Sequence, residues 1–226
     1  MAQLTWLGHS AFQIQTMSYT LLIDPFISGN PSATVTAEQL HPTHILVSHG
    51  HGDHLGDTIA IAKKNNALVI APNELAVYCG KKGCRFHAMH LGGAHEFPFG
   101  KVKLTIAHHG SGLEKGDEFL YLGNPCGFLL WIEGKVLYHA GDTALFLDMQ
   151  LIGEMNAIDI ALLPIGDNFT MGPDDAVKAA EFLKPKLVIP MHYNTFDVIK
   201  QNPNAFALKV KNCTVEILEV GKSREF

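Results

Sequence analysis

The stretch Ser48-His49-Gly50-His51-Gly52-Asp53-His54-Leu55-Gly56 is dense in side chains that bind metal ions. Imidazole nitrogens and carboxylate oxygens are the ligands that suit zinc and its first-row neighbours. On an extended backbone His49 and His51 point to the same side, because side chains alternate with a period of two. Asp53 and His54 are adjacent in the sequence, so they cannot join the pair formed by His49 and His51 unless the chain turns. The spacing therefore predicts two neighbouring metal positions, one taken by His49 and His51 and the other by Asp53 and His54.

A short apolar run precedes several candidate ligands along the chain. These runs and ligands are Ile45–Val47 before His49, Leu104–Ile106 before His109, Val136–Tyr138 before Asp142, and Leu187–Ile189 before His192. In α/β proteins, strands commonly gather polar groups from distant parts of the sequence at their carboxyl ends. The pattern therefore predicts an α/β protein whose site lies at one edge of its sheets.

Strands followed by alternating helix and strand are expected in each half of the chain, roughly 1–112 and 113–226. This repetition favours one domain over residues 1–226, made of two sheet-plus-helix units packed face to face. Between the halves, 111–123 is polar and contains glycine. We expect that segment to be a loop over the site. The dipeptide Glu133-Gly134 predicts a tight hairpin turn.

The pattern His-Gly-His-Gly-Asp-His resembles the H-x-H-x-D-H signature of the metallo-β-lactamase superfamily of hydrolases. Shorter motifs resemble one branch, the bacterial and archaeal metal-dependent hydrolases of uncharacterised substrate, and extend over nearly the whole chain. They include Gly8-His9-Ser10, Asp24-Pro25, Gly92-Gly93-Ala94-His95, His109-Gly110-Ser111, His139-Ala140-Gly141-Asp142-Thr143, Pro164-Ile165-Gly166-Asp167-Asn168 and Pro190-Met191-His192-Tyr193. The resemblance implies an αββα sandwich, two mixed β-sheets flanked by helices, with the site along one edge of the paired sheets.

The same resemblance completes the two metal positions. It implies that His109 joins the first position, that His192 joins the second, and that Asp142 bridges both. His108 competes with His109, because adjacent strand residues face opposite ways and only one can point inward. The match to the branch's His-Gly-Ser motif favours His109.

Further residues are candidates around the metal ligands. Asp24 resembles the superfamily carboxylate that accepts a hydrogen bond from a ligand histidine, although Asp-Pro also suits a simple turn. The others follow strands, match the branch's motifs, and would bind substrate or stabilise an oxyanion unless they only shape their loops. They are His9, His95, Asp167, Asn168 and Asn194. Among them, His95 and Asn194 are the candidates for donating a proton or hydrogen bond.

These ligands suit two divalent ions, zinc first, with manganese, iron or nickel as alternatives. Paired ions hold a hydroxide and polarise the bond that breaks. We therefore expect a hydrolase in which Asp53 also orients the hydroxide, acting on an ester, lactone or phosphodiester bond of a small metabolite. The alternatives are a di-iron redox or oxygen-reactive protein and a metal-binding sensor without turnover.

The composition of the chain limits the classes of binding partner that we expect. The formal net charge is −5 and no run of Lys or Arg occurs, which argues against a nucleic-acid partner. No leader and no apolar stretch of about 18 residues is visible, so a cytoplasmic protein without membrane contact is expected. The 4 cysteines are irregularly spaced and predict free thiols. A small-molecule substrate is expected, and self-association is left open.

Overall fold

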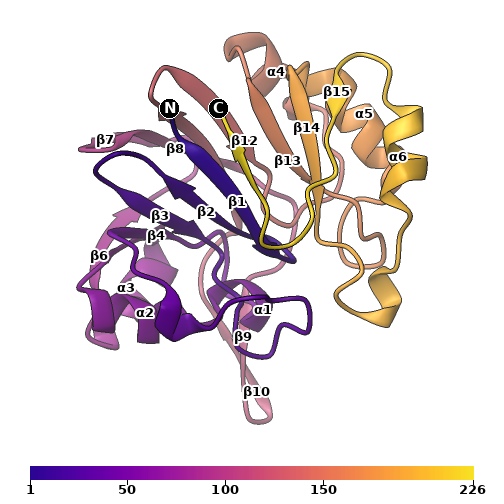
Figure 1. Ribbon diagram of the computed structural model, residues 1–226. Helices are drawn as coiled ribbons and strands as arrows, with labels where there is room; N and C mark the ends of the chain where they lie inside the picture. Colours follow the sequence, from indigo (N-terminus) through magenta and orange to yellow (C-terminus); the bar gives the residue numbers. More distant parts are fainter.

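The computed structural model describes residues 1–226, which form two seven-stranded sheets and a two-stranded hairpin. The sheets have the orders β16-β1-β2-β3-β4-β5-β6 and β15-β14-β13-β12-β11-β8-β7. Figure 1 shows the sheets facing each other, with helices on their outer sides. The predicted αββα sandwich of two mixed sheets is therefore confirmed.

The first sheet is antiparallel at one side and parallel at the other. Its strands are β1 (Gln3–Gly8), β2 (Ala11–Gln15), β3 (Thr20–Ile23), β4 (His44–Leu46), β5 (Leu68–Pro72), β6 (Arg85–Met89) and β16 (Ser223–Glu225). Strands β3 to β6 run parallel, whereas β16, β1, β2 and β3 pair antiparallel. The accompanying helices are the 3₁₀ turn η1 (Ala37–Gln39), α1 (Gly52–Leu55), α2 (Thr58–Asn65) and α3 (Asn73–Lys81).

The second sheet has the same mixed character. Its strands are β7 (Ala94–Phe97), β8 (Gly100–Ile106), β11 (Cys126–Ile132), β12 (Lys135–His139), β13 (Ile160–Pro164), β14 (Leu187–Met191) and β15 (Thr214–Val215). Its helices are α4 (Asp148–Met155), α5 (Pro173–Leu183), η2 (Asp197–Ile199) and α6 (Pro203–Lys209). Ile132 pairs with Lys135, so the turn predicted at Glu133-Gly134 is present.

The chain changes sheets earlier than the expected boundary near residue 112. Strands β7 and β8 already belong to the second sheet, so the change falls between Met89 and Ala94. Strand β16 then returns at the end of the chain and pairs with β1. The sequence halves therefore do not coincide with the two sheets.

Two apolar clusters hold these layers together. The larger contains 44 buried residues, drawn largely from the second sheet, its helices and the inner side chains of β1 to β5. The smaller, of 19 residues, lies between the first sheet and helices α2 and α3. Strands β13 and β14 are buried along their whole length, as expected for parallel strands covered on both faces.

The segment predicted as a loop is instead a hairpin. Strands β9 (Gly112–Lys115) and β10 (Glu118–Tyr121) pair antiparallel, and Figure 1 shows them projecting from the body. Every residue of β10 is exposed. Without a buried face the strands have no alternating apolar pattern, and this is why the sequence suggested a loop.

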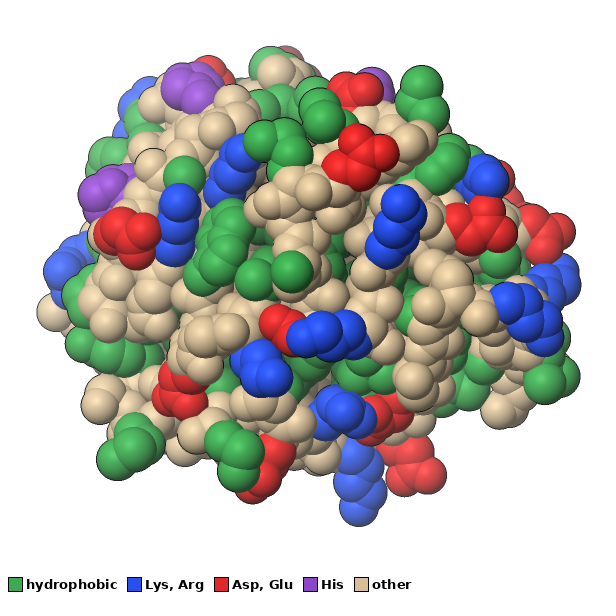
Figure 2. All heavy atoms as spheres, turned by 90° about the horizontal axis from the view of Figure 1, so that it is seen from above, with side chains coloured by type: hydrophobic (Ala, Val, Ile, Leu, Met, Phe, Trp, Pro, Cys, Tyr) green, Lys and Arg blue, Asp and Glu red, His purple; other side chains and the backbone are tan.

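Figure 2 shows the face that looks upward in the view of Figure 1. On it, Lys and Arg side chains alternate with Asp and Glu and form no continuous basic patch. None of the helices combines the length and the apolar character needed to cross a bilayer.

Candidate metal centre

The histidine-rich stretch leaves β4 on an extended backbone and then turns into the short helix α1. His51 caps this helix with φ −63° and ψ 149°, so His49 and His51 precede it, while Asp53 and His54 lie on its turn. Gly56 ends the helix with φ +41°, and a Cβ there would come within 2.5 Å of the Pro25 carbonyl oxygen. The helical turn that carries Asp53 and His54 is thus fixed at its end by close packing on the loop after β3.

Three imidazoles form the first ligand group. His51 Nδ1 lies 3.0 Å from His49 Nε2 and 3.2 Å from His109 Nε2. Burial is the largest influence on all three side chains and lowers the pKa of each, most strongly for His49. Neutral rings present lone pairs, and three lone pairs this close suit one shared cation.

The proton on His49 can be located from its neighbours. The Ser48 hydroxyl donates to Asp24 Oδ2 over 2.6 Å and lies 2.9 Å from His49 Nδ1. Because the hydroxyl hydrogen is already used, Ser48 Oγ accepts from His49 Nδ1. The Nε2 atom of His49 is therefore bare and faces the other imidazoles.

The second group contains His54, Asp53 and His192, and the ligand atoms of these residues and of the neighbouring His9 all lie within 4.8 Å of one another. His54 Nδ1 donates to Asp24 Oδ2 over 2.8 Å, so its Nε2 is the free ligand atom. That Nε2 is buried without a hydrogen-bond partner. A histidine held through its other nitrogen by a carboxylate is the usual arrangement of a metal ligand.

Asp142 reaches both groups. Its carboxylate oxygens lie 3.2 Å from His54 Nε2, 3.0 Å from His192 Nε2 and 3.6 Å from His109 Nε2. The side chain is almost fully buried and its Oδ1 has no hydrogen-bond partner. Asp142 therefore lies between the two groups, and its bridging of two ions stays a prediction.

The buried pair of His54 and Asp142 requires a positive charge between its facing atoms. Burial disfavours the charged form of His54, but Asp142 and Asp24 outweigh it and raise its pKa well above the usual value. Burial likewise disfavours ionised Asp142, but His192 and His54 outweigh it and lower its pKa. A proton or a metal ion must stand between these atoms, so the donor set fits a divalent cation.

The structure brings all seven predicted metal ligands into these groups. They are His49, His51, Asp53, His54, His109, Asp142 and His192. The competitor His108 is exposed and packs its ring 5.1 Å from that of Phe146, away from the groups. His9 and Asp24 also join the site, through Asp53 and His54 respectively.

His95 does not reach the site, which contradicts its predicted catalytic role. It lies on β7 and pairs with Val102 near the start of β8, with its ring 4.2 Å from that of His87. His109 follows the opposite end of β8, roughly 20 Å further along an extended chain. The motif placed His95 in a turn, but the chain there enters the far end of the sheet.

Three other candidates shape their own loops. Asn194 accepts from the Gln201 N–H through its side-chain oxygen, and its own N–H donates to the Ile199 carbonyl. Asp167 Oδ1 accepts from the Asn168 N–H, and both residues are exposed in a turn. Asn194, Asp167 and Asn168 therefore shape their own loops, and their expected contacts with substrate stay predictions.

Sequence reasoning missed several side chains of the site. Ser111 Oγ accepts from the Gly50 N–H over 3.0 Å, and Thr195 Oγ1 lies 2.9 Å from His9 Nδ1. Phe169 stands at the rim of the site and is 54% exposed. Only Ser111 carried a signal, as the last residue of the His-Gly-Ser motif.

Several residues of the site have left-handed backbones. The φ angles are 55° at His9, 46° at Asp24 and 54° at His192. Residues other than glycine avoid this region because the Cβ crowds the backbone. The strand-to-loop turns that present these side chains are therefore strained.

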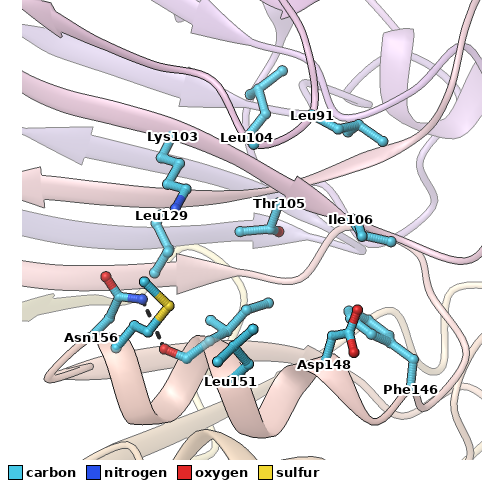
Figure 3. Close-up of a pocket in the computed structure, with 13 residues that line it drawn as sticks. Leu91, Lys103, Leu104, Thr105, Ile106, Leu129, Phe146, Asp148, Leu151 and Asn156 are labelled. Carbon is cyan, nitrogen blue, oxygen red and sulfur yellow. Dashed lines mark hydrogen bonds between the residues drawn. The ribbon is translucent and has the colours of Figure 1, made fainter.

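The cavity at the site has a volume of about 240 Å³ and is lined by His51, Asp53, His109, Asp142, Phe169 and His192. A larger cavity of about 410 Å³ lies elsewhere, between β8, β11 and α4. Figure 3 shows apolar side chains such as Leu104, Leu129 and Leu151 around it. None of the metal ligands lines it, so the chemistry belongs to the smaller cavity.

Known proteins resemble this chain over its whole length. The model of the β-lactamase superfamily domain matches residues 3–192. A UPF0173 metal-dependent hydrolase of Bacillus mycoides is 55% identical over 99% of both chains.

Among solved structures, the metallo hydrolase Igni18 of the archaeon Ignicoccus hospitalis is 36% identical, with a TM-score of 0.90 over 100% of this chain and 99% of that one. A diiron β-hydroxylase of Streptomyces venezuelae has a TM-score of 0.78 at 16% identity, and the match spans 54% of its length. This second likeness shows the fold alone. From the metal-binding cluster, the fold and these relatives, we conclude that the chain belongs to the β-lactamase superfamily and is a metal-dependent hydrolase of the UPF0173 family.

Proposed function

We propose that this hydrolase binds two divalent ions, zinc first among them, and cleaves the ester or lactone bond of a small uncharged metabolite. The observation that carries the proposal is the cavity of about 240 Å³, to which both ligand groups contribute and whose lining contains no Lys or Arg. Proteins that bind phosphate esters commonly use Arg or Lys to hold the negative charge. A neutral carbonyl compound therefore suits the site better than a phosphodiester.

When bound, paired divalent ions supply hydroxide at neutral pH and polarise the scissile bond. Asp53 has one carboxylate oxygen within 3.2 Å of His9, and its side chain is 30% exposed toward the cavity. The second oxygen is thus free to ligate a metal ion and to orient the attacking water. Phe169 offers an apolar wall for the acyl part of the substrate.

The test is turnover by the zinc-, manganese-, nickel- and iron-loaded protein of an aryl acetate, a γ-lactone and an aryl phosphodiester. We expect hydrolysis of the ester and lactone, and its loss in His51→Ala and Asp142→Asn. The control is His108→Ala, which changes an exposed histidine outside both groups and should keep full activity. Faster turnover of the phosphodiester, or activity in metal-free His51→Ala, would refute the proposal.

The alternative of a di-iron, oxygen-reactive protein has less support. The diiron enzyme that shares the fold is distant, whereas the close Bacillus relative is named a hydrolase. A visible absorption spectrum of protein purified without chelator separates the two, because oxygen-reactive di-iron centres absorb in that range and zinc does not. The remaining alternative, a sensor without turnover, would be favoured if metal-loaded protein hydrolysed none of the substrates.

A further inference from the structure

His9 lies beside the second ligand group but behind the cavity. Its ring is 1% exposed, its centroid is 4.0 Å from that of His192, and it does not line the cavity. The backbone is held from two sides, because the His9 carbonyl accepts from Trp6 Nε1 over 2.9 Å and from the His192 N–H over 3.1 Å. The position of this ring is therefore fixed by the fold.

Both ring nitrogens of His9 have partners. Nε2 lies 3.2 Å from Asp53 Oδ2, and Nδ1 lies 2.9 Å from Thr195 Oγ1. A carboxylate only accepts hydrogen bonds, so Nε2 must carry the hydrogen in the contact with Asp53. In a neutral ring Nδ1 is then the acceptor, and the Thr195 hydroxyl donates to it.

The position of this hydrogen decides whether His9 is a metal ligand or a residue that orients Asp53. One ring nitrogen of His9 is close enough to Asp53, His54 and His192 for His9 to be a further ligand beside them. A nitrogen that bears a hydrogen has no lone pair for a metal ion, however. The hydrogen bond instead engages Oδ2 of Asp53 and leaves Oδ1 free for an ion.

We propose that Thr195 and His9 form a positioning pair that orients the Asp53 carboxylate through the Nε2 hydrogen of His9, and that His9 is not a metal ligand. The inference rests on the two-ion centre proposed above. It adds Thr195, a residue outside every motif of the site, to the groups that control how the second ion is held.

The first test is a long-range ¹H–¹⁵N NMR spectrum of the zinc-loaded protein, with His9→Gln used to assign the ring. We expect His9 Nε2 to carry a hydrogen and Nδ1 to behave as a hydrogen-bond acceptor. An Nε2 without a hydrogen, with the shift of a zinc-bound nitrogen, would overturn the proposal.

The second test compares the dissociation constant of the more weakly held zinc ion in matched variants, by competition with a chelator. Gln at position 9 keeps a donor for Asp53 but is a poor ligand, so His9→Gln should bind within about 3-fold of the native protein, whereas His9→Leu should lose about 10–100-fold. Equal losses in both variants would show a ligand and refute the positioning role.

Thr195 gives an independent comparison that leaves His9 in place. Thr195→Ser keeps the hydroxyl and should bind zinc like the native protein, whereas Thr195→Val removes it and should weaken the second ion. Identical constants for the two variants would overturn the role of Thr195.

These measurements need no substrate. A protein with two zinc ions and the expected Nε2 hydrogen that turns over neither ester nor lactone would refute the proposed function alone. Hydrolysis combined with a zinc-bound His9 would refute the positioning pair alone.

Discussion

At the scale of single residues, Asp24 shows how a side chain outside the ligand groups controls them. Its oxygens accept from the Ser48 N–H over 2.7 Å, the Ser48 hydroxyl over 2.6 Å and His54 Nδ1 over 2.8 Å. Asp24→Asn would replace one acceptor oxygen with an amide donor and release His54, so we expect the metal dissociation constant to rise about 10–100-fold. Chelator competition measures this change.

The matched control is Asp57→Asn. Asp57 accepts from the backbone N–H groups of Ile27 and Ser28 in the neighbouring loop and contacts no ligand. Its substitution should leave metal affinity unchanged. If Asp24→Asn binds metal as tightly as this control does, Asp24 has no role in holding His54.

His44 gives a residue-scale prediction about pH. Burial lowers its pKa to about 4, with Arg85 adding to the effect, and its ring packs 4.6 Å from that of Phe99. In the unfolded chain a histidine titrates near 6.5. The unfolded state therefore binds more protons as pH falls from 6.5 toward 4, and the free energy of unfolding decreases over that range.

We expect urea denaturation in the presence of chelator to show a smaller loss of stability between pH 7 and pH 5 in His44→Phe than in the native protein. The comparison removes the shared contribution of the other histidines. An equal loss in both proteins would mean that His44 does not titrate differently on folding.

At the scale of elements, helix α1 depends on the turn at Gly56. A Cβ at this position would come within 2.8 Å of Phe26 Cα as well as 2.5 Å of the Pro25 oxygen, at φ +41°. Gly56→Ala should therefore lower the free energy of unfolding by roughly 1–3 kcal/mol and weaken metal binding. Gly52→Ala is the control, because nothing lies within 4 Å of its added Cβ. Equal thermal midpoints for the two variants would contradict this reading of the turn.

Most elements could be predicted from local pattern, and the exceptions have physical causes. Continuous apolar runs such as Leu187–Met191 before His192 are characteristic of buried parallel strands, so a strand that leads to a ligand can be recognised in the sequence. The hairpin of β9 and β10 lacks a buried face and therefore lacks a pattern. Helix α1 spans only four residues, which is too short for a period of 3.6 to be seen.

At the scale of the whole molecule, the metal centre joins the two sheets. His49, His51, Asp53 and His54 follow β4 of the first sheet, whereas His109, Asp142 and His192 follow β8, β12 and β14 of the second. The strand-end pattern revealed this convergence. It could not reveal which sheet each strand joins, because hydrogen-bond partners such as β16 and β1 are distant in sequence.

We predict that residues 1–226 unfold in one transition whose midpoint falls when metal is removed. Zinc at 100 times its dissociation constant should stabilise the folded state by about 2.7 kcal/mol. Thermal unfolding with zinc and with excess chelator measures the difference, and His192→Ala should reduce it. Two separate transitions, or a midpoint indifferent to metal, would contradict the prediction.

The left-handed backbone of His192, with φ 54°, places a metal ligand at the expense of folding stability. Glycine adopts this conformation without a steric penalty, whereas a histidine there costs about 1 kcal/mol or more. The His192 side chain also has a buried Nδ1 without a hydrogen-bond partner, so laboratory evolution of the metal-free protein for heat resistance alone would not preserve histidine at this position. Variants selected in this way would gain thermal stability and lose a metal ligand. A screen for improved variants of this enzyme therefore has to measure turnover together with melting temperature.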